Sequence, residues 1–223
     1  SLIALFLMLR VNDHEYGPAP LATDVFTSLK EGLQHARSNK PILGVLVVTI
    51  IMNFFGFSFI SMIPVIGAET LLLDAAEIGI LGSMEGAGAF VGLLLLSVCA
   101  DRRYFMRLFV GGSILLLSMI VLFGLSSWFL LALVILLIAG LGESGFGGMQ
   151  ASITYVATRK AMRSRVMGLL VVCIGSGPIG ILHTGFLASS VGADIAVCII
   201  AIEGLVAMLI ALYYLPALRQ PNV

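Results

Sequence analysis

The sequence predicts an all-α membrane protein with six transmembrane helices, and composition is the first reason. Of its 223 residues, 60% are apolar and only 11% are charged, and the mean hydropathy is +1.12. A soluble domain of this length needs more polar surface than these numbers allow. Six segments contain the roughly 20 apolar residues that a spanning helix requires: 41–66, 75–100, 104–125, 128–157, 166–190 and 193–217.

The placement of charge supports the same count of helices. All twelve Lys and Arg residues precede the first segment or follow the second, fourth and sixth, and the loops at 67–74, 126–127 and 191–192 carry none. Basic loops face the cytosol. We therefore expect both ends of the six-helix block, 41–217, to be cytosolic, which an even number of spans requires.

Three segments lie outside the six-helix block, at residues 1–9, 10–40 and 218–223. Residues 1–9, SLIALFLML, are apolar but too short to span, and they lack the basic start and cleavage site of a signal peptide. We interpret them as the truncated end of a preceding transmembrane helix, with an interfacial or disordered tail as the alternative. Residues 10–40 are predicted as a cytosolic linker containing a short helix, which the capping-box pair Ser28 and Glu31 would open. Residues 218–223 are predicted as a cytosolic tail.

Ionisable residues inside the spans are functional candidates, because an ionised side chain at the bilayer centre costs roughly 2.5–3.5 kcal/mol on insertion scales. Counting from the span ends places three glutamates near the midplane: Glu85, Glu143 and Glu203. His183 lies in the outer third of its span, and its near-neutral titration suits proton transfer. These four residues are the proton-coupling candidates, and static pairing or packing is the alternative for each.

Glu143 has the most informative surroundings. Five glycines lie around it in GLGESGFGG, residues 140–148. Helical spacing puts Gln150 and Thr154 on the same face as Glu143, which predicts a polar stripe beside a water-filled cavity. The glycines permit bending and close helix approach. Glu85 shares its face with Gly82, Gly88 and Gly92, which predicts a helix-packing surface. Asn53, near the midplane of the first span, is a further substrate-cavity candidate with Glu143, Gln150 and Thr154.

Several motifs, in order and spacing, resemble the major facilitator superfamily, in particular its bacterial drug- and siderophore-exporter branch, of the enterobactin-exporter type. EGLQHARSNKPILGVLVVTIIMNFF looks like the central loop and seventh helix of those exporters. SVCADRR looks like a worn copy of the cytosolic G-x-x-x-D-R-x-G-R-R loop, with Ser97 in place of the first glycine and Tyr104 in place of a later one. RSRVMGLL, GSGPIG and GFLASSVG resemble the eleventh helix and its approach.

The resemblance implies the C-terminal six-helix bundle of a twelve-helix fold whose two bundles rock around a central site. It implies a secondary active transporter in the bacterial inner membrane that exports a small amphiphilic drug or siderophore by proton antiport. The missing N-terminal half, protons and the lipid bilayer would be its partners. Asp101, Arg102 and Arg103 are candidates for a cytosolic gate that forms charge-assisted bonds with a neighbouring helix end; anchoring to anionic lipid is the alternative for the two arginines.

Two other functions are alternatives. GESG at 142–145 together with His183 is similar to the serine and histidine of rhomboid intramembrane proteases, so that Ser144 and His183 would form a dyad. Against this, the first four spans contain no histidine. A non-transporting scaffold or self-assembling half-transporter is the third possibility. The sequence shows no phosphate-binding loop and no metal-ligand cluster, so we expect no cofactor, no bound metal and no nucleic-acid partner.

Overall fold

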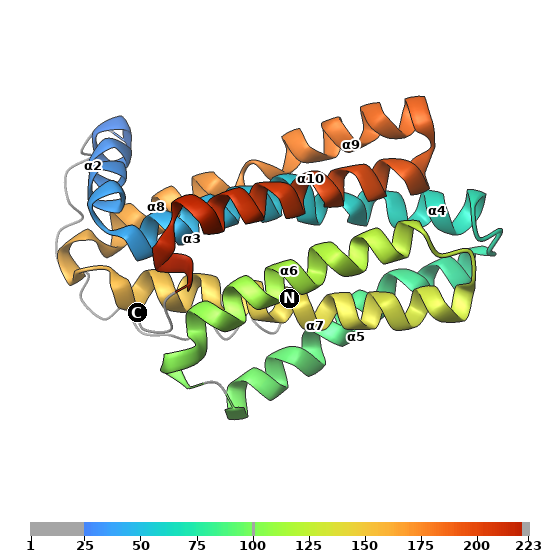
Figure 1. Ribbon diagram of the computed structural model, residues 1–223, viewed down its shortest axis with the longest axis horizontal. Helices are drawn as coiled ribbons and strands as arrows, with labels where there is room; N and C mark the ends of the chain where they lie inside the picture. Colours follow the sequence, from blue (N-terminus) through green and yellow to red (C-terminus); the bar gives the residue numbers. More distant parts are fainter. Residues whose placement is uncertain (1–24, 100, 220–223) are drawn as a thin grey trace, which may run out of the picture.

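The computed structural model describes residues 25–99 and 101–219, and over these residues the chain consists of helices joined by short loops (Figure 1). The expected helix remnant at 1–9, the linker up to residue 24 and residues 220–223 lie outside the described part. Six stretches within it are long and apolar enough to cross a membrane: Lys40–Glu69, Ala75–Val98, Arg102–Gly124, Phe129–Ala157, Lys160–Val191 and Ala193–Tyr214. The prediction of an all-α protein with six apolar spans is confirmed.

Four of the spans contain one long helix each. These are α5 (Ala75–Cys99), α6 (Phe105–Gly124, after the short 3₁₀ helix η3, Arg102–Tyr104), α7 (Phe129–Ala157) and α10 (Ala193–Tyr214). The short helix η5 (Pro216–Arg219) follows α10. The first and fifth spans are interrupted, and both interruptions fall near their middles.

The first span changes helix type three times. It consists of α3 (Lys40–Ile51), the π-helix η1 (Met52–Gly56), the 3₁₀ helix η2 (Phe57–Met62) and α4 (Ile63–Glu69). Asn39 caps α3, and Pro41 lies in its first turn, where the missing N–H is not needed. The fifth span consists of η4 (Lys160–Met162), α8 (Arg163–Ile174) and α9 (Gly177–Val191), separated at Gly175–Ser176. Pro178 cannot donate the next intrahelical bond, which explains the break.

The helices pack around α7, which contacts α5 on one side and α6 on the other. α10 packs against α6, and α9 lies beside α10 (Figure 1). The largest fully buried side chains include Phe59, Phe109 and Phe123. Phe146 of α7 stacks on Phe109, with ring centroids 5.4 Å apart, which fixes α7 against α6.

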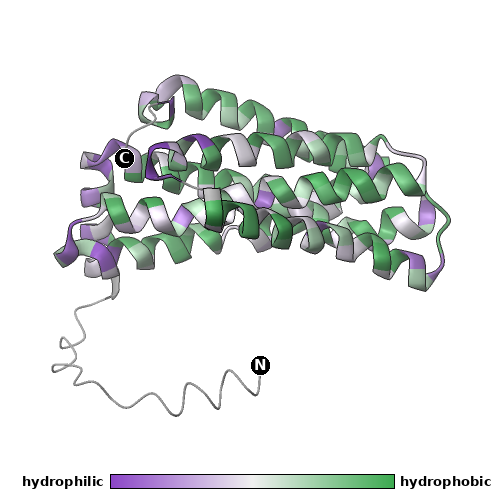
Figure 2. Cartoon of the chain, turned by 90° about the horizontal axis from the view of Figure 1, so that it is seen from below, coloured by the Kyte–Doolittle hydropathy of each residue, from purple (hydrophilic) through white to green (hydrophobic). Residues whose placement is uncertain are grey.

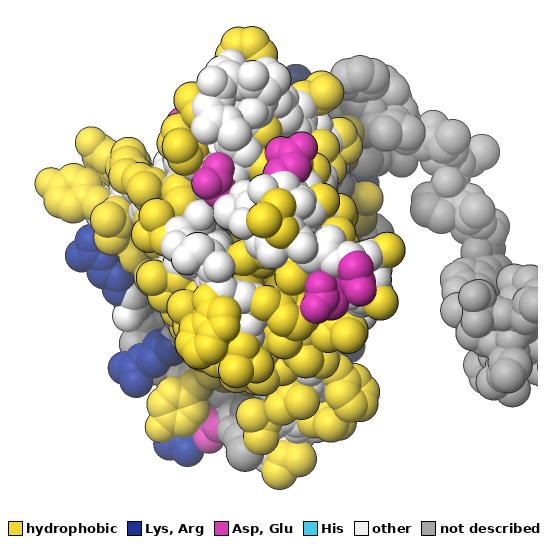
Figure 3. All heavy atoms as spheres, turned by 90° about the vertical axis from the view of Figure 1, so that its right-hand side faces the viewer, with side chains coloured by type: hydrophobic (Ala, Val, Ile, Leu, Met, Phe, Trp, Pro, Cys, Tyr) yellow, Lys and Arg dark blue, Asp and Glu magenta, His cyan; other side chains and the backbone are white. Residues whose placement is uncertain are grey.

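The two ends of the bundle differ in charge. Hydrophobic residues cover the length of the helices, and hydrophilic ones gather towards the ends (Figure 2). We call basic end the one that carries Arg102, Arg103, Arg107, Arg159, Lys160, Arg163, Arg165 and Arg219, and acidic end the one that carries Glu69, Asp74, Glu77 and Asp194. The end-on view shows acidic side chains on the facing end and basic ones only at its rim (Figure 3).

The helix α2 (Val25–Ser38) lies across the basic end (Figure 1). Its Glu31 carboxylate is 2.9 Å from the guanidinium of Arg165 in α8. Gly32 allows α2 to lie close to the backbone of α8, since a Cβ there would be 3.0 Å from the Arg165 carbonyl oxygen. The predicted start at Ser28 is wrong, because α2 begins at Val25 and Ser28 lies inside its first turn.

Candidate functional site

The glycines around Glu143 hold α7 close to its two neighbours. A Cβ at Gly140 would overlap backbone atoms of Glu85 and Ala89 in α5. Cβ atoms at Gly142 and Gly145 would lie within 3.0 Å of backbone atoms of α6. Gly147, in contrast, has no neighbouring atom within 4 Å of its would-be Cβ. The prediction of close helix approach is therefore met at three of the five glycines, on two opposite faces of α7.

This close approach brings together two of the predicted glutamates. The carboxyl group of Glu85 in α5 is close enough to the carboxyl group of Glu143 in α7 to interact with it electrostatically. Glu85 is only 8% exposed, whereas Glu143 is half-buried. Atom Oε1 of Glu85 is shielded from solvent and has no hydrogen-bond donor among the described residues. A buried carboxylate oxygen without a donor is unfavourable, so Glu85 is a candidate for a residue that holds a proton.

A hollow adjoins the carboxyl pair. Glu143 lines a pocket of about 230 Å³ together with Ala89, Leu93, Ser144, Gly147 and Gly148. A second pocket of about 300 Å³ shares Leu93 and Gly148 with the first and continues along α5 and α7 to Leu96, Ser97, Phe105 and Met149. The two together form a mainly apolar path from the carboxyl pair towards the basic end.

Gln150 and Thr154 are hydrogen-bonded inside the bundle in this structure. Both are buried rather than exposed to an open cavity. The Gln150 amide Nε2 donates to the hydroxyl of Thr49 in α3 at 2.7 Å, and Thr49 itself donates to the Val45 carbonyl. Thr154 donates to the carbonyl of Gln150 at 2.8 Å. In this structure the part of the predicted polar stripe nearer the basic end joins α7 to α3 through Gln150. Of the four residues of the stripe, only Glu143 and Gly147 line the hollow.

Asn53 lies in the π-helix η1 of the first span. Its side-chain amide donates to the carbonyl oxygen of Thr49 at 2.9 Å, at the point where the α-helical bonding pattern changes. Single π turns of this kind are frequent at functional sites. Asn53 is half-buried and belongs to the same α3–α7 network as Gln150, because both side chains bond to Thr49.

The two interrupted spans cross at their interruptions. A Cβ at Gly180 of α9 would overlap the carbonyl oxygen of Phe54 in η1, so only glycine permits this contact. One turn later His183 Nε2 is 3.0 Å from Glu203 Oε2 of α10, and the His183 ring lies 5.7 Å from that of Phe54. Their side chains are 34% and 41% exposed. His183 and Glu203 were predicted separately, and the structure pairs them, away from Glu85 and Glu143.

The predicted gate residues bond mainly among themselves. Asp101 caps η3, accepting from the Arg103 backbone N–H at 3.0 Å and from its guanidinium at 2.7 and 2.9 Å. These bonds hold the pKa of the Asp101 carboxyl below its ordinary value. Arg103 is thus the bonding partner of Asp101 in this structure, and a bond to a neighbouring helix end stays a prediction. The carboxylate is the acceptor that fixes the turn between α5 and α6, and Arg102 is exposed beside it.

Comparison with known proteins adds the family. The sequence matches the family model of the Major Facilitator Superfamily over residues 1–179 and again over residues 68–223. The chain belongs to the Major Facilitator Superfamily. The six spans correspond to half of a major facilitator fold, and the family consists of membrane transporters. No curated protein and no solved structure matched the sequence.

Family and geometry disfavour the protease alternative. The Ser144 hydroxyl donates to the carbonyl of Leu141, one turn back in its own helix, at 2.7 Å. His183 pairs with Glu203, so each member of the predicted dyad has another partner. Among the described residues, no three His, Cys, Asp or Glu side chains come together as a metal site.

Proposed function

We propose that this major facilitator protein exports a small amphiphilic molecule, of the drug or siderophore class, in exchange for protons. The observation that carries the proposal is the Glu85–Glu143 carboxyl pair between α5 and α7. Two adjacent carboxylates repel each other when both are ionised, so such a pair retains one proton. The donorless Oε1 of Glu85 is consistent with a proton held there.

The hollow beside the pair suits the second ligand. Its walls are mainly apolar side chains and glycine, with two serines, and Glu143 is the charged group of the first pocket. Apolar pockets with few polar groups are typical of small-molecule sites. A substrate that contacts Glu143 changes the balance between the protonated and ionised pair. Proton and substrate then compete, which is the condition for antiport.

Alternating access requires segments that change conformation, and the two interrupted spans supply them. η1 and η2 interrupt the first span, Gly175–Ser176 interrupts the fifth, and the parts touch at Phe54 and Gly180. Discontinuous helices are a recurrent feature of transporter sites near the midplane. We assign the site to this crossing and the α5–α7 pair, with Asn53 at its edge and His183–Glu203 as a second candidate proton site. Asp101, Arg102 and Arg103 would shape closure at the basic end.

The proposal includes an orientation. The basic end faces the cytosol of a bacterial cell by the positive-inside rule, which puts both flanks of the six spans on that side of the inner membrane. The chain would be the C-terminal half of the fold and would work with an N-terminal six-helix half.

The experiment is substrate-linked proton movement in proteoliposomes, using the full-length gene product and a panel of lipophilic cations, antibiotics and siderophores. Glu143→Gln and Glu85→Gln each remove one member of the pair while keeping a hydrogen-bonding side chain. We expect both variants to bind substrate but to lose proton coupling. Glu69→Gln, at the exposed acidic end, is the matched control and should transport as the unmodified protein does.

Two results would contradict the proposal. Normal coupling in both pair variants would make the pair structural. No proton-linked flux of any compound in the unmodified protein, under either sign of the gradient, would remove the antiport mechanism itself.

A further inference from the structure

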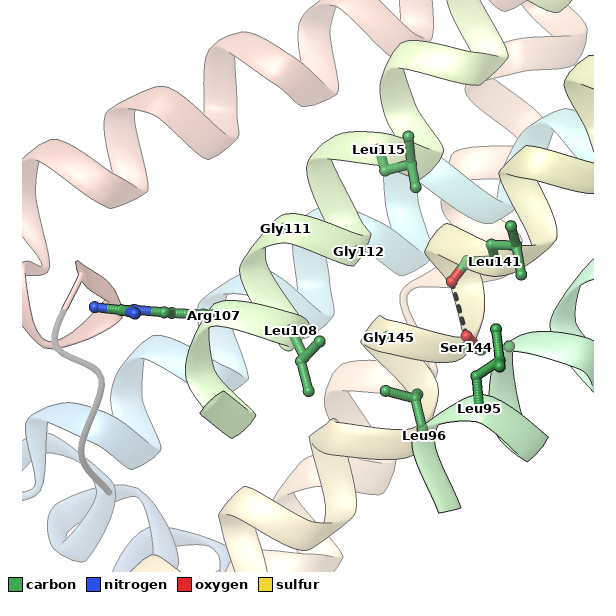
Figure 4. A pocket seen from close by; sticks show the side chains of 11 residues that line it. Leu95, Leu96, Arg107, Leu108, Gly111, Gly112, Leu115, Leu141, Ser144 and Gly145 are labelled. Carbon is green, nitrogen blue, oxygen red and sulfur yellow. Dashed lines mark hydrogen bonds between the residues drawn. The ribbon is translucent and has the colours of Figure 1, made fainter. Parts of the chain in front are cut away.

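A groove separate from the carboxyl pair lies between α5 and α6, with α7 as its floor (Figure 4). Its volume is about 310 Å³. Leucines and glycines form nearly all of its lining, and the hydroxyl of Ser144 is already bonded to the Leu141 carbonyl. Arg107 is the single charged residue that lines it.

The groove exists because both outer helices pack on α7 through glycine. Gly112 of α6 and Gly92 of α5 each lie so close to α7 that an added Cβ would overlap it. α5 and α6 therefore contact α7 from two sides, and the space between α5 and α6 is open to the outside of the bundle. A Cβ at Gly111, on the groove wall, would have no heavy atom within 4 Å. Among the described residues, no side chain fills this space.

The groove has a direction and a charged mouth. α6 begins at the basic end, so Arg107 lies at the mouth and Leu115, eight residues later, lies about 12 Å deeper. The Arg107 side chain extends away from the leucines that line the groove (Figure 4). Arg102 and Arg103 lie at the same end and are exposed. An apolar chain thus fits inside the groove while its polar head would meet positive charge.

We propose that this groove binds one anionic phospholipid, with an acyl chain along α7 and the phosphate at Arg107. Guanidinium groups bind phosphate through paired hydrogen bonds. Basic residues near a membrane surface attract anionic lipids. The lipid belongs to the leaflet at the basic end and would fill the wedge beside the α5–α7 contact. The groove adjoins the hollow proposed for the substrate, with which it shares Ser144 and Leu96, but it contains neither glutamate of the pair.

The test is lipid binding to the purified full-length gene product in mild detergent, followed by native mass spectrometry. Phosphatidylglycerol and phosphatidylcholine with identical chains are the probes. We expect one phosphatidylglycerol to bind in preference to phosphatidylcholine. Arg107→Gln should weaken phosphatidylglycerol binding about fivefold, the equivalent of roughly 1 kcal/mol for one basic residue at the surface. Arg219→Gln, also at the basic end, is the matched control.

A second pair of variants tests the apolar part. Gly111→Leu has room for its Cβ and extends an apolar side chain into the groove, so it should abolish binding of the preferred lipid. Gly86→Leu in α5, where a Cβ also meets nothing and which lies outside the groove lining, should bind as the unmodified protein does. Leu95→Trp blocks the same groove from the α5 wall and replaces Gly111→Leu if that variant does not fold.

Equal binding of the two lipids, or no effect of Arg107→Gln, would overturn the assignment of an anionic headgroup. Equal binding by both blocking variants and by the Gly86→Leu control would overturn the groove as the site.

Discussion

The packing of α7 predicts that replacing glycine by alanine changes the stability of the protein in opposite directions at two positions of this helix. At Gly140 an added Cβ would overlap the Glu85 carbonyl oxygen and the Ala89 backbone nitrogen, neither of which can rotate away. Overpacking of this kind costs about 1–3 kcal/mol. Replacing a helical glycine by alanine gains roughly 0.5–1 kcal/mol through backbone entropy. Gly140→Ala should therefore destabilise the protein by about 1–2 kcal/mol.

At Gly147 only the gain in backbone entropy applies, because no atom lies within 4 Å of the new methyl group and there is no overpacking cost. Gly147→Ala should stabilise the protein by up to about 1 kcal/mol. The assay is reversible unfolding by SDS in mixed micelles, followed by far-UV circular dichroism. Equal effects of the two substitutions would refute the inferred α5–α7 contact. Because Gly140 also sets the separation of Glu85 and Glu143, Gly140→Ala should reduce proton coupling as well.

Two further predictions concern polar contacts outside that interface. Thr49→Val leaves the Gln150 amide buried without its acceptor and should cost about 1–3 kcal/mol in the same unfolding assay, whereas adding Gln150→Leu should recover part of the loss; strictly additive effects would contradict the α3–α7 bond. Arg103→Gln should raise the pKa of Asp101 towards its ordinary value of about 3.9, measured by carbon NMR of labelled aspartate. Because the pKa of the paired Asp101 carboxyl is lowered in the folded state, the pair stabilises the fold above about pH 4. This stabilisation is lost as pH falls through the lowered pKa of the folded state. An unchanged pKa of Asp101 in the variant would exclude the Asp101–Arg103 pair.

Much of the fold could be predicted because a membrane span is recognised from its own segment of sequence, without knowledge of its neighbours in space. Length, apolarity and the positions of Lys and Arg determine the number of spans without knowledge of neighbours. The break in the fifth span also had a local signal, since Pro178 follows three small residues in GSG. The π-helix at Met52–Gly56 had none that we recognised, because it depends on the crossing with Gly180.

The candidate site could be predicted as single residues but not as pairs. Glu85 and Glu143 each have glycines around them, yet only the packing of α5 on α7 shows that they face each other. Glu85, Glu143 and Glu203 are predicted at the same depth in the membrane, but depth does not show which helices are neighbours. In the structure Glu203 lies on α10 and contacts His183 of α9. Gln150 and Thr154 were assigned to a cavity from helical spacing alone. Spacing identifies a shared face but does not identify the helix that covers it, which for these residues is α3.

The central claim is that the Glu85–Glu143 pair holds a proton that substrate displaces. Infrared difference spectroscopy of the full-length protein, with and without a transported substrate, measures the carbonyl band of a protonated carboxyl group directly. We expect a band that disappears on substrate binding and is absent or shifted in both Glu85→Gln and Glu143→Gln, but not in Glu203→Gln. A band that survives in both pair variants, or no protonated carboxyl at neutral pH, would contradict it.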